Sequence, residues 1–507
     1  MQDNKNMRIV IVGGGSAGWM TAAALSHILP NANHHLTLVE SSAIGTVSVG
    51  EATIPGIREF NQMLGIDEAE FLGFTKGTFK LGIAFHDWYQ KGQRYMHPFG
   101  PYGVNMQGVP FHHYWLKDKI KGHETPIQDF CLEYTAALNN KFCHPQRQSR
   151  SALANLKYAY HFDALLYAEF LKKFATGHGV NHIEADVKLV HQHNNGSISS
   201  VSLSNGQQIN GDLFIDCSGF KGLLIAKTLG VEFDDWREYL PCDSAIAQPS
   251  ESLLHLAPYT ISRAHEHGWQ WQIPLQHRMG NGFVYSSDFL PKDIAVAKLA
   301  KRLPSKALEQ ARQLKWTNGK RKMAWKANCV AIGLAAGFIE PLESTGLQLI
   351  QSAIMRLLAL FPDKSIVDIG EGENADIRTF NRYTNEEFLA IRDFVILHYK
   401  ANQRDDSEFW QYCQHMAIPD SLKAKMELYE QSGHVFRDNN ELFNEISWFS
   451  VMNGQGLRPK RYHPLVENMP EEQRVKNLKS IAGAMQEAML QMPDHGDYLK
   501  QFCKSPS

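Results

Sequence analysis

A short strand, a glycine-rich turn and a helix follow one another in the segment RIVIVGGGSAGWMTAAALSHIL. Residues 8–12 form the β-branched run that is typical of a buried parallel strand, and residues 17–29 carry apolar side chains at helical spacing. The turn between them has the pattern GxGxxG, in Gly13, Gly15 and Gly18. These glycines permit a tight turn, a close approach of the backbone to a pyrophosphate, and close packing of helix on strand. The segment therefore predicts the first βα unit of a dinucleotide-binding fold.

A second predicted strand, HLTLVE, ends at Glu40, about twenty residues after the last glycine of the turn. A carboxylate at this position is suited to hydrogen-bond a ribose hydroxyl, while the phosphates would lie at the helix N-terminus. A glycine-rich turn with a purely structural role would not account for the acidic strand end. We therefore expect the chain to bind a dinucleotide.

Two later segments favour FAD over NAD as that dinucleotide. The segment GQQINGDLFIDCSGF (206–220) predicts a strand that ends near Asp216 and Gly219, and ANCVAIGLAAGF (327–338) predicts a strand followed by a glycine-containing turn. A large FAD domain collects such distant strands into one sheet. The segment IGTVSVGEATIP (44–55) either lies along the flavin or is a surface loop.

The composition argues against several classes of partner. The formal net charge is −2 and the basic residues are scattered, so neither nucleic acid nor an anionic membrane is expected. Seven cysteines without a CxxC pair argue against a disulfide framework or a metal site and favour a reducing cytoplasm. The N-terminus leads directly into a strand pattern, and the longest apolar run, residues 329–339, is too short to span a bilayer. We expect a cytoplasmic protein that binds a small molecule.

Five motifs in matching order resemble the flavin-dependent halogenases of the tryptophan-halogenase type. They are GGGSAGW, GEATIP, TFKLGIAF (78–85), WQWQIP (269–274) and GLAAGFIEPLESTG (333–346). The resemblance extends from the first strand to about residue 350, and more loosely to GQG at residues 454–456. It implies an α/β fold with a Rossmann-like FAD-binding domain of the flavin monooxygenase type, β-rich inserts and a mainly helical C-terminal substrate region.

The resemblance also implies a reaction. Reduced FAD, O2 and chloride or bromide would yield hypohalous acid, which would pass through a tunnel to an electron-rich aromatic such as an indole or a tryptophan-containing compound. The family's WxWxIP segment, here Trp269, Trp271, Ile273 and Pro274, would be a wall that keeps the substrate away from the flavin. Bulky indoles and a φ-locked proline suit a wall, although such a pattern is also typical of a half-buried strand. The single dinucleotide fingerprint predicts that a separate NADH-dependent flavin reductase supplies the reduced FAD.

The family's catalytic lysine corresponds to Lys80, and its acidic partner corresponds to Glu343. Lys80 would hydrogen-bond hypohalous acid or form a haloamine, and Glu343 would accept or support the proton that leaves the ring. Apolar residues alternate along residues 79–85, which puts Lys80 on the opposite face with Gly82 and Ala84, where small neighbours would leave room for a ligand. Without the motif, Lys80 would be interpreted as an ordinary strand lysine that extends to solvent.

The Ser-Thr-Gly after Glu343 resembles the family's halide site, in which Thr345 and Gly346 would offer backbone N–H groups as an anion nest. These residues also precede a helical pattern and suit an N-cap. The two roles are compatible, because a helix N-terminus attracts anions. Glu340 is expected to have a structural, hydrogen-bonding role.

The expected ligand contacts fall into two groups. Those for FAD are Gly13, Gly14, Gly15, Ala17, Gly18, Glu40, Glu51, Val187, Leu334 and Leu347. Those for the aromatic substrate are the resemblance-derived pair His97 and Phe99, together with Trp448. Aromatic residues are more often part of a core than of a binding site, so this second group is the less specific prediction.

Residues 1–350 are expected to form the FAD-binding domain and residues 351–507 a mainly helical region packed against it. Inserts near residues 86–150 and 231–320 are rich in aromatic residues, His and Gly and would build the substrate chamber. The protein could form a homodimer.

Free tryptophan is not the favoured substrate. Family members that act on free tryptophan carry paired tyrosines and an acidic clamp in the C-terminal part, and NNELFNEISWFSVMNGQG (439–456) has no Tyr-Tyr. Indole, a substituted indole or a tryptophan within a larger molecule fits better, and the choice between chloride and bromide stays open. A flavin-dependent aromatic monooxygenase is the alternative, but it would have little use for Lys80, Glu343 or the tryptophan wall.

Overall fold

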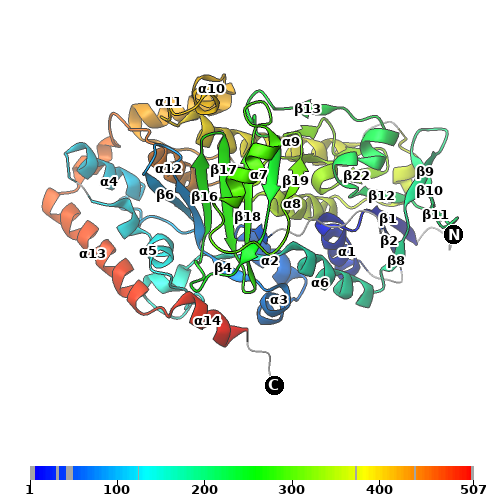
Figure 1. Cartoon of the computed structure of the whole chain (residues 1–507), viewed down its shortest axis with the longest axis horizontal. Helices are drawn as coiled ribbons and strands as arrows, with labels where there is room; N and C mark the ends of the chain where they lie inside the picture. Colours follow the sequence, from blue (N-terminus) through cyan, green and yellow to red (C-terminus); the bar gives the residue numbers. More distant parts are fainter. Residues whose placement is uncertain are drawn as a thin grey trace.

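The computed structural model describes residues 6–29, 33–41, 50–123, 125–370, 374–438 and 441–503. At one end of the molecule lies a six-stranded sheet (right-hand side of Figure 1). Its neighbouring strands are parallel, except that the edge strand β21 is antiparallel to β22. Its order is β21 (Trp325–Lys326), β22 (Cys329–Ala331), β12 (Leu213–Asp216), β1 (Met7–Val12), β2 (His34–Glu40) and β8 (Asn181–Glu184).

The first strand and helix are those that the glycine-rich turn predicts. In β1, residues 9–12 are almost completely buried, as expected for a β-branched run at the centre of a parallel sheet. Helix α1 (Ser16–Ile28) packs against α6 (Ala164–Gly177) and α8 (Gly346–Ala359). The segments 206–220 and 327–338 contribute β12 and β22, so the predicted collection of distant strands into one sheet is confirmed. The fold is of the predicted α/β, Rossmann-like class.

A second, eight-stranded sheet occupies the middle of the molecule (Figure 1) and is antiparallel except between β16 and β5. Its strands are β19 (Arg312–Lys315), β14 (Ser244–Ala247), β18 (Arg278–Tyr285), β17 (Gly268–Pro274), β16 (Thr260–His265), β5 (Gly82–His86) and β6 (Arg94–Pro98), with β15 (Ser250–Glu251) paired to β18. A small sheet of β3 (Gly50–Ala52), β7 (Ala159–Asp163) and β4 (Thr78–Lys80) lies beside it.

The predicted alternating strand at residues 79–85 is wrong in one respect. The chain leaves the small sheet after Lys80 and enters the eight-stranded sheet at Gly82, so β4 and β5 belong to different sheets. Gly82 does not make room for a ligand, because a Cβ atom there would lie 2.5 Å from the carbonyl oxygen of His97 on β6. The glycine instead permits the close approach of that neighbouring strand.

The remaining elements complete the two ends. Two small sheets contain β9 (Val187–Gln192), β10 (Ile198–Leu203) and β11 (Gln208–Asn210), and β13 (Phe233–Asp235), β20 (Gly319–Arg321) and β23 (Gly337–Phe338). The helices before residue 350 include α2 (Gly56–Met63), α3 (Glu68–Thr75), α4 (Phe111–Ile120), α5 (Leu132–Leu138) and α7 (Lys292–Ala300).

Among the described residues after 350, the regular elements are all helical, as predicted. After α8 come α9 (Ala375–Lys400), α10 (Glu408–His415), α11 (Asp420–Ser432), α12 (Glu445–Gly454), α13 (Glu471–Leu490) and α14 (His495–Phe502). Helix α13 runs along the edge of the molecule, next to α5 (Figure 1). No helix within the described ranges is long and apolar enough to cross a membrane.

Candidate active site

A cavity of about 690 Å³ opens where β1, β2 and β12 end, and we call it the large cavity. It is lined by most of the residues predicted to contact FAD. These are Gly13, Gly14, Gly15, Ala17, Glu40, Glu51, Val187, Leu334 and Leu347. Of the predicted segment 44–55, residues 44–49 lie outside the described part of the chain.

The glycines of the turn have distinct local surroundings. Gly13 has φ +118°, and a Cβ there would lie 2.1 Å from the carbonyl oxygen of Cys217 on the neighbouring strand end. A Cβ on Gly18 would lie 1.8 Å from the carbonyl oxygen of Gly13, and Gly18 does not line the cavity. Its contact with the cofactor stays a prediction, and the position of Gly18 permits the close packing of α1 on β1. Gly15 has no atom within 4 Å of its Cβ position, so the turn leaves open space at the start of α1.

The two predicted cofactor carboxylates differ in their electrostatics. Glu40 lies at the end of β2 and its Oε1 is 2.9 Å from Nζ of Lys172 and 2.7 Å from Nε2 of His182. Its other oxygen accepts a hydrogen bond from the indole of Trp19. Glu51 borders the cavity, and burial raises its pKa to about 7. A carboxyl group with this pKa can accept or donate a hydrogen bond near neutral pH.

The predicted wall forms one side of the large cavity. Trp269, Trp271 and Ile273 alternate along β17, so they share one strand face, and all three line the cavity. The indole of Trp269 donates a 3.1 Å hydrogen bond to Oε1 of Glu340. Tyr399 donates to the same oxygen at 2.5 Å. Glu340 thus has the structural role that was expected, since it holds an indole of the wall.

The last wall residue, Pro274, is not among those that line the large cavity. Its carbonyl oxygen accepts a 2.7 Å hydrogen bond from the hydroxyl of Thr78 on β4. The wall strand is therefore tied at one end to Glu340 and at the other end to the strand that carries Lys80.

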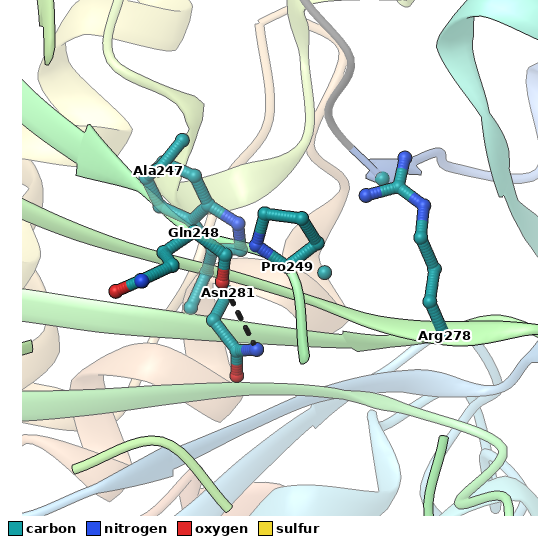
Figure 2. Close-up of a pocket in the computed structure, with 8 residues that line it drawn as sticks. Ala247, Gln248, Pro249, Arg278 and Asn281 are labelled. Atoms are coloured by element: carbon teal, nitrogen blue, oxygen red, sulfur yellow. Dashed lines mark hydrogen bonds between the residues drawn. The ribbon is translucent and has the colours of Figure 1, made fainter. Parts of the chain in front are cut away.

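Trp271 also borders a second, much smaller pocket of about 10 Å³, which is enough for about one water molecule. Figure 2 shows Gln248 and Asn281 on one side of this pocket and Arg278 on the other. The amide nitrogen of Asn281 donates to the carbonyl oxygen of Gln248 at 3.4 Å. The side-chain oxygens of both residues are buried and accept no hydrogen bond from the described residues.

Lys80 is completely buried at the end of β4. Its Nζ donates to the backbone oxygen of Thr53 at 2.8 Å and to the hydroxyl oxygen of Ser344 at 2.9 Å. Burial lowers the pKa of Lys80 to about 7, and the negative charge of Glu343 opposes this shift. The centroid of the Phe99 ring lies 5.3 Å from Nζ.

Glu343 is also completely buried, and two histidines hold it. Nδ1 of His97 lies 2.8 Å from one carboxylate oxygen, and Nε2 of His398 lies 2.8 Å from the other. Burial alone would raise the pKa of Glu343, but His97 and His398 outweigh it and lower the pKa to about 2. Glu343 is therefore a carboxylate at neutral pH. We call Lys80, Glu343 and these partners the lysine–glutamate site.

The predicted halide residues lie between the two regions. Gly346 and Ser344 line the large cavity, and Gly346 begins α8, where the first N–H groups have no partner within the helix. Thr345 is at the N-cap position, but its hydroxyl caps nothing and is buried without a hydrogen-bond partner among the described residues. This helix start therefore offers unsatisfied donors to an anion.

The predicted substrate residues have mixed surroundings. His97 belongs to the lysine–glutamate site through its contact with Glu343, and the ring of Phe99 lies near Lys80. Trp448 is buried, its indole donates to Glu441 at 3.1 Å, and its ring packs edge-on against Phe394. Contact of these rings with a substrate stays a prediction.

Sequence reasoning missed three partners of the lysine–glutamate site. Thr53 contributes only a backbone oxygen, which no side-chain pattern reveals. His398 lies on α9 within a helical run that predicts only a packed helix. Ser344 was considered only as part of the halide segment, and its contact with Lys80 depends on its left-handed backbone, with φ 59°.

The parallel sheet, the cradle of glycines and the cavity at the strand ends define a dinucleotide-dependent enzyme of the FAD type. A sequence profile of the tryptophan halogenase family matches residues 8–471. The chain therefore belongs to the tryptophan halogenase family and is a flavin-dependent halogenase.

Individual relatives support this assignment. The chain is 31% identical to tryptophan 7-halogenase RebH of Lentzea aerocolonigenes over 98% of each protein, and 35% identical to tryptophan 6-halogenase SttH of Streptomyces toxytricini over 89% of this chain and 90% of that protein. Among solved structures, it resembles Xcc4156, a flavin-dependent halogenase from Xanthomonas campestris, with a TM-score of 0.93, 45% identity and 99% of each chain covered. It also resembles BrvH, a flavin-dependent halogenase from Brevundimonas sp. BAL3, with a TM-score of 0.93, 41% identity and 98% and 99% coverage.

Proposed function

We propose that the protein attaches chloride or bromide to an electron-rich aromatic, with indole or an indole-containing compound as its substrate, and that hypohalous acid travels from the large cavity to Lys80. One contact carries the proposal. Ser344 borders the large cavity, whereas Lys80 does not. The hydroxyl oxygen of Ser344 accepts a hydrogen bond from Lys80 and so links the cavity to the amine. The tryptophan halogenases among the relatives, and the aromatic rings near Lys80, support an indole as the substrate class.

The residues of the large cavity fit FAD. The turn before α1 leaves open space at Gly15, and unsatisfied donors occur at the start of α8. When bound, reduced FAD would supply two of the four electrons that reduce O2, and the halide would supply the other two as it becomes hypohalous acid. The unpartnered hydroxyl of Thr345 and the N–H groups that begin α8 would hold the halide beside it.

Lys80 can hold hypohalous acid in either protonation state. As an ammonium it has three N–H donors, two of which bind Thr53 and Ser344, so the third is free to donate to hypohalous acid. As a neutral amine it can bond the halogen through its lone pair as the O–X bond breaks. One N–H proton then joins the departing hydroxide to give water, so one of the two hydrogen bonds is lost. With a pKa of about 7, both states are populated near neutral pH.

Glu343 is positioned to remove the ring proton. The halogen is transferred to a ring carbon, the ring becomes cationic, and loss of the proton from the same carbon restores aromaticity. A carboxylate with a pKa of about 2 stays ionised beside that cation and can take its proton. His97 and His398 hold the two carboxylate oxygens and so fix the direction of transfer.

The proposal is tested by product analysis with chloride and with bromide. The protein, reduced FAD from a separate NADH-dependent flavin reductase, O2 and an indole panel that includes free tryptophan should give products with the isotope pattern of the added halogen. Hydroxylated products that form without halide would contradict the proposal and identify a monooxygenase. The chain alone should oxidise little NADH, and rapid NADH oxidation would remove the need for the reductase.

A further inference from the structure

His161 lies in the middle strand of the small sheet, between β3 and β4, and is completely buried. It is directly opposite Thr78, two residues before Lys80. Both ring nitrogens have hydroxyl partners: Nδ1 is 2.9 Å from Oγ1 of Thr78, and Nε2 is 2.9 Å from Oγ1 of Thr260. Neither the family motifs nor the mechanism above uses this histidine.

The hydrogen bonds around His161 have only one consistent direction. Thr78 has a single hydroxyl hydrogen and donates it to the carbonyl oxygen of Pro274 at 2.7 Å, so it must accept from Nδ1–H of His161. Burial, with the nearby positive charge of Lys80, holds the pKa of His161 well below its usual range, so the ring is neutral. Nε2 is then an acceptor, and Thr260 donates to it. The hydrogen bonds thus form a continuous relay from Thr260 through His161 and Thr78 to Pro274.

This hydrogen-bond relay joins the parts that must stay aligned for halogen transfer. Thr260 lines the large cavity, and Pro274 ends the wall strand. Thr78 is on the same short strand as Lys80. Tyr160 precedes His161 on the same strand, and its carbonyl oxygen accepts a hydrogen bond from the backbone N–H of Thr53. The carbonyl oxygen of Thr53 in turn accepts a hydrogen bond from Lys80. Strand β7 therefore positions both β4, which carries Lys80, and Thr53, which is one of the two hydrogen-bond partners of the amine.

We infer that His161 is a positioning residue that holds the Lys80 strand in register with the wall, so that the halogenating species leaving the large cavity meets the amine. The inference rests on the proposed function of Lys80. A displacement of about 1 Å in such a geometry can lower the rate about 10²-fold. Loss of the hydrogen bond between His161 and Thr78 should therefore lower the yield of halogenated product while hypohalous acid still forms at the same rate.

Two substitutions separate the two sides of the ring. His161→Asn places an amide N–H close to the position of Nδ1 and can still donate to Thr78. His161→Gln reaches the position of Nε2 instead and loses the tie to Thr78. The measured quantity is halogenated product per O2 consumed, with the same supply of reduced FAD. We expect His161→Asn to stay within about threefold of wild type and His161→Gln to fall about 10²-fold, with comparable FAD affinity in the two.

A role in packing alone would not distinguish the two amides, so equal ratios in both variants would overturn the inference. If His161→Gln does not fold, Thr78→Val tests the same tie, because it removes the hydroxyl at nearly unchanged shape. Thr78→Val should show the loss and Thr78→Ser should recover the wild-type ratio. A normal ratio in Thr78→Val would also overturn the inference.

The tautomer offers a test that does not depend on activity. In ¹⁵N-histidine-labelled protein, with the His161→Asn spectrum used for assignment, Nδ1 should be the protonated nitrogen and Nε2 the bare one. The opposite tautomer would contradict the proposed direction of these hydrogen bonds. Lys80→Met is measured beside these variants: halogenation retained there refutes the proposed function itself, whereas its loss together with a normal ratio in His161→Gln refutes only the role of His161.

Discussion

The large cavity and the lysine–glutamate site handle a ligand in opposite ways. Glycine backbone and apolar side chains line much of the cavity, together with the carboxyl groups of Glu40 and Glu51, so we expect it to hold the cofactor through shape, backbone N–H groups and these two carboxyls. The lysine–glutamate site is built around two ionisable groups with no exposed surface, Lys80 and Glu343. Burial shifts the pKa of the first, and the neighbouring histidines shift that of the second. A change in the cavity should therefore alter the affinity for FAD, whereas a change in the site should alter the rate with FAD bound. The contact between Ser344 and Lys80 connects the two.

The largest effect is expected for Lys80→Met, which keeps the side-chain length and removes the amine. Halogenated product should fall by about 10²- to 10³-fold or more, because no group remains to hold the halogenating species. FAD binding and O2 consumption should persist, since Lys80 does not line the large cavity. O2 uptake is measured beside product yield. Retained halogenation would remove Lys80 from the mechanism, and lost FAD binding would break the division between the two regions.

Glu343→Gln should lower the rate by about 10²-fold, because the amide cannot take the ring proton. His97 can still hydrogen-bond the amide oxygen, and the side chain keeps its shape, so the fold should persist. Single-turnover product formation measures the effect, and an indole deuterated at the reacting carbon should show a larger isotope effect in the variant than in wild type. An unchanged rate would exclude Glu343 as the base.

Two glycine substitutions should sharpen the cavity side of the comparison. Gly15→Ala meets no protein atom within 4 Å, so the apo protein should unfold at the wild-type temperature while FAD binds about tenfold more weakly. Gly18→Ala would clash with the carbonyl oxygen of Gly13 and should cost about 1–3 kcal/mol of stability. Thermal unfolding and FAD titration are compared for both. Normal FAD affinity in Gly15→Ala would show that the cofactor does not approach this turn.

The most gradual effect, and the smallest within one pH unit of the site's pKa, is a pH dependence of stability that comes from Lys80. Its pKa falls from 10.5 in the unfolded chain to about 7 in the fold, so between these values the unfolded chain binds more protons. Stability contributed by Lys80 should therefore rise with pH by up to about 1.4 kcal/mol per pH unit, and the burial penalty is complete below pH 7. The difference in unfolding free energy between wild type and Lys80→Met should follow this slope. A flat difference would mean that Lys80 is not desolvated.

Local sequence was sufficient for the strand, turn and helix of residues 8–29, because steric limits on glycine and apolar periodicity act within a few residues of each other. It also indicated that distant strands would join one sheet, as β12 and β22 do. It could not place the break between β4 and β5, since alternation continues through Leu81 and only pairing with two different sheets separates the strands.

The sequence alone was enough to identify the halogenase family and to select Lys80 and Glu343 as candidates, because their motifs are short and contiguous. The ionisation of these groups was decided only by the tertiary structure. The pKa of Lys80 depends on complete burial, and that of Glu343 depends on His97 and His398, which lie 246 and 55 residues away in the chain. Desolvation and Coulomb interactions depend on distance in space, so no local pattern encodes them.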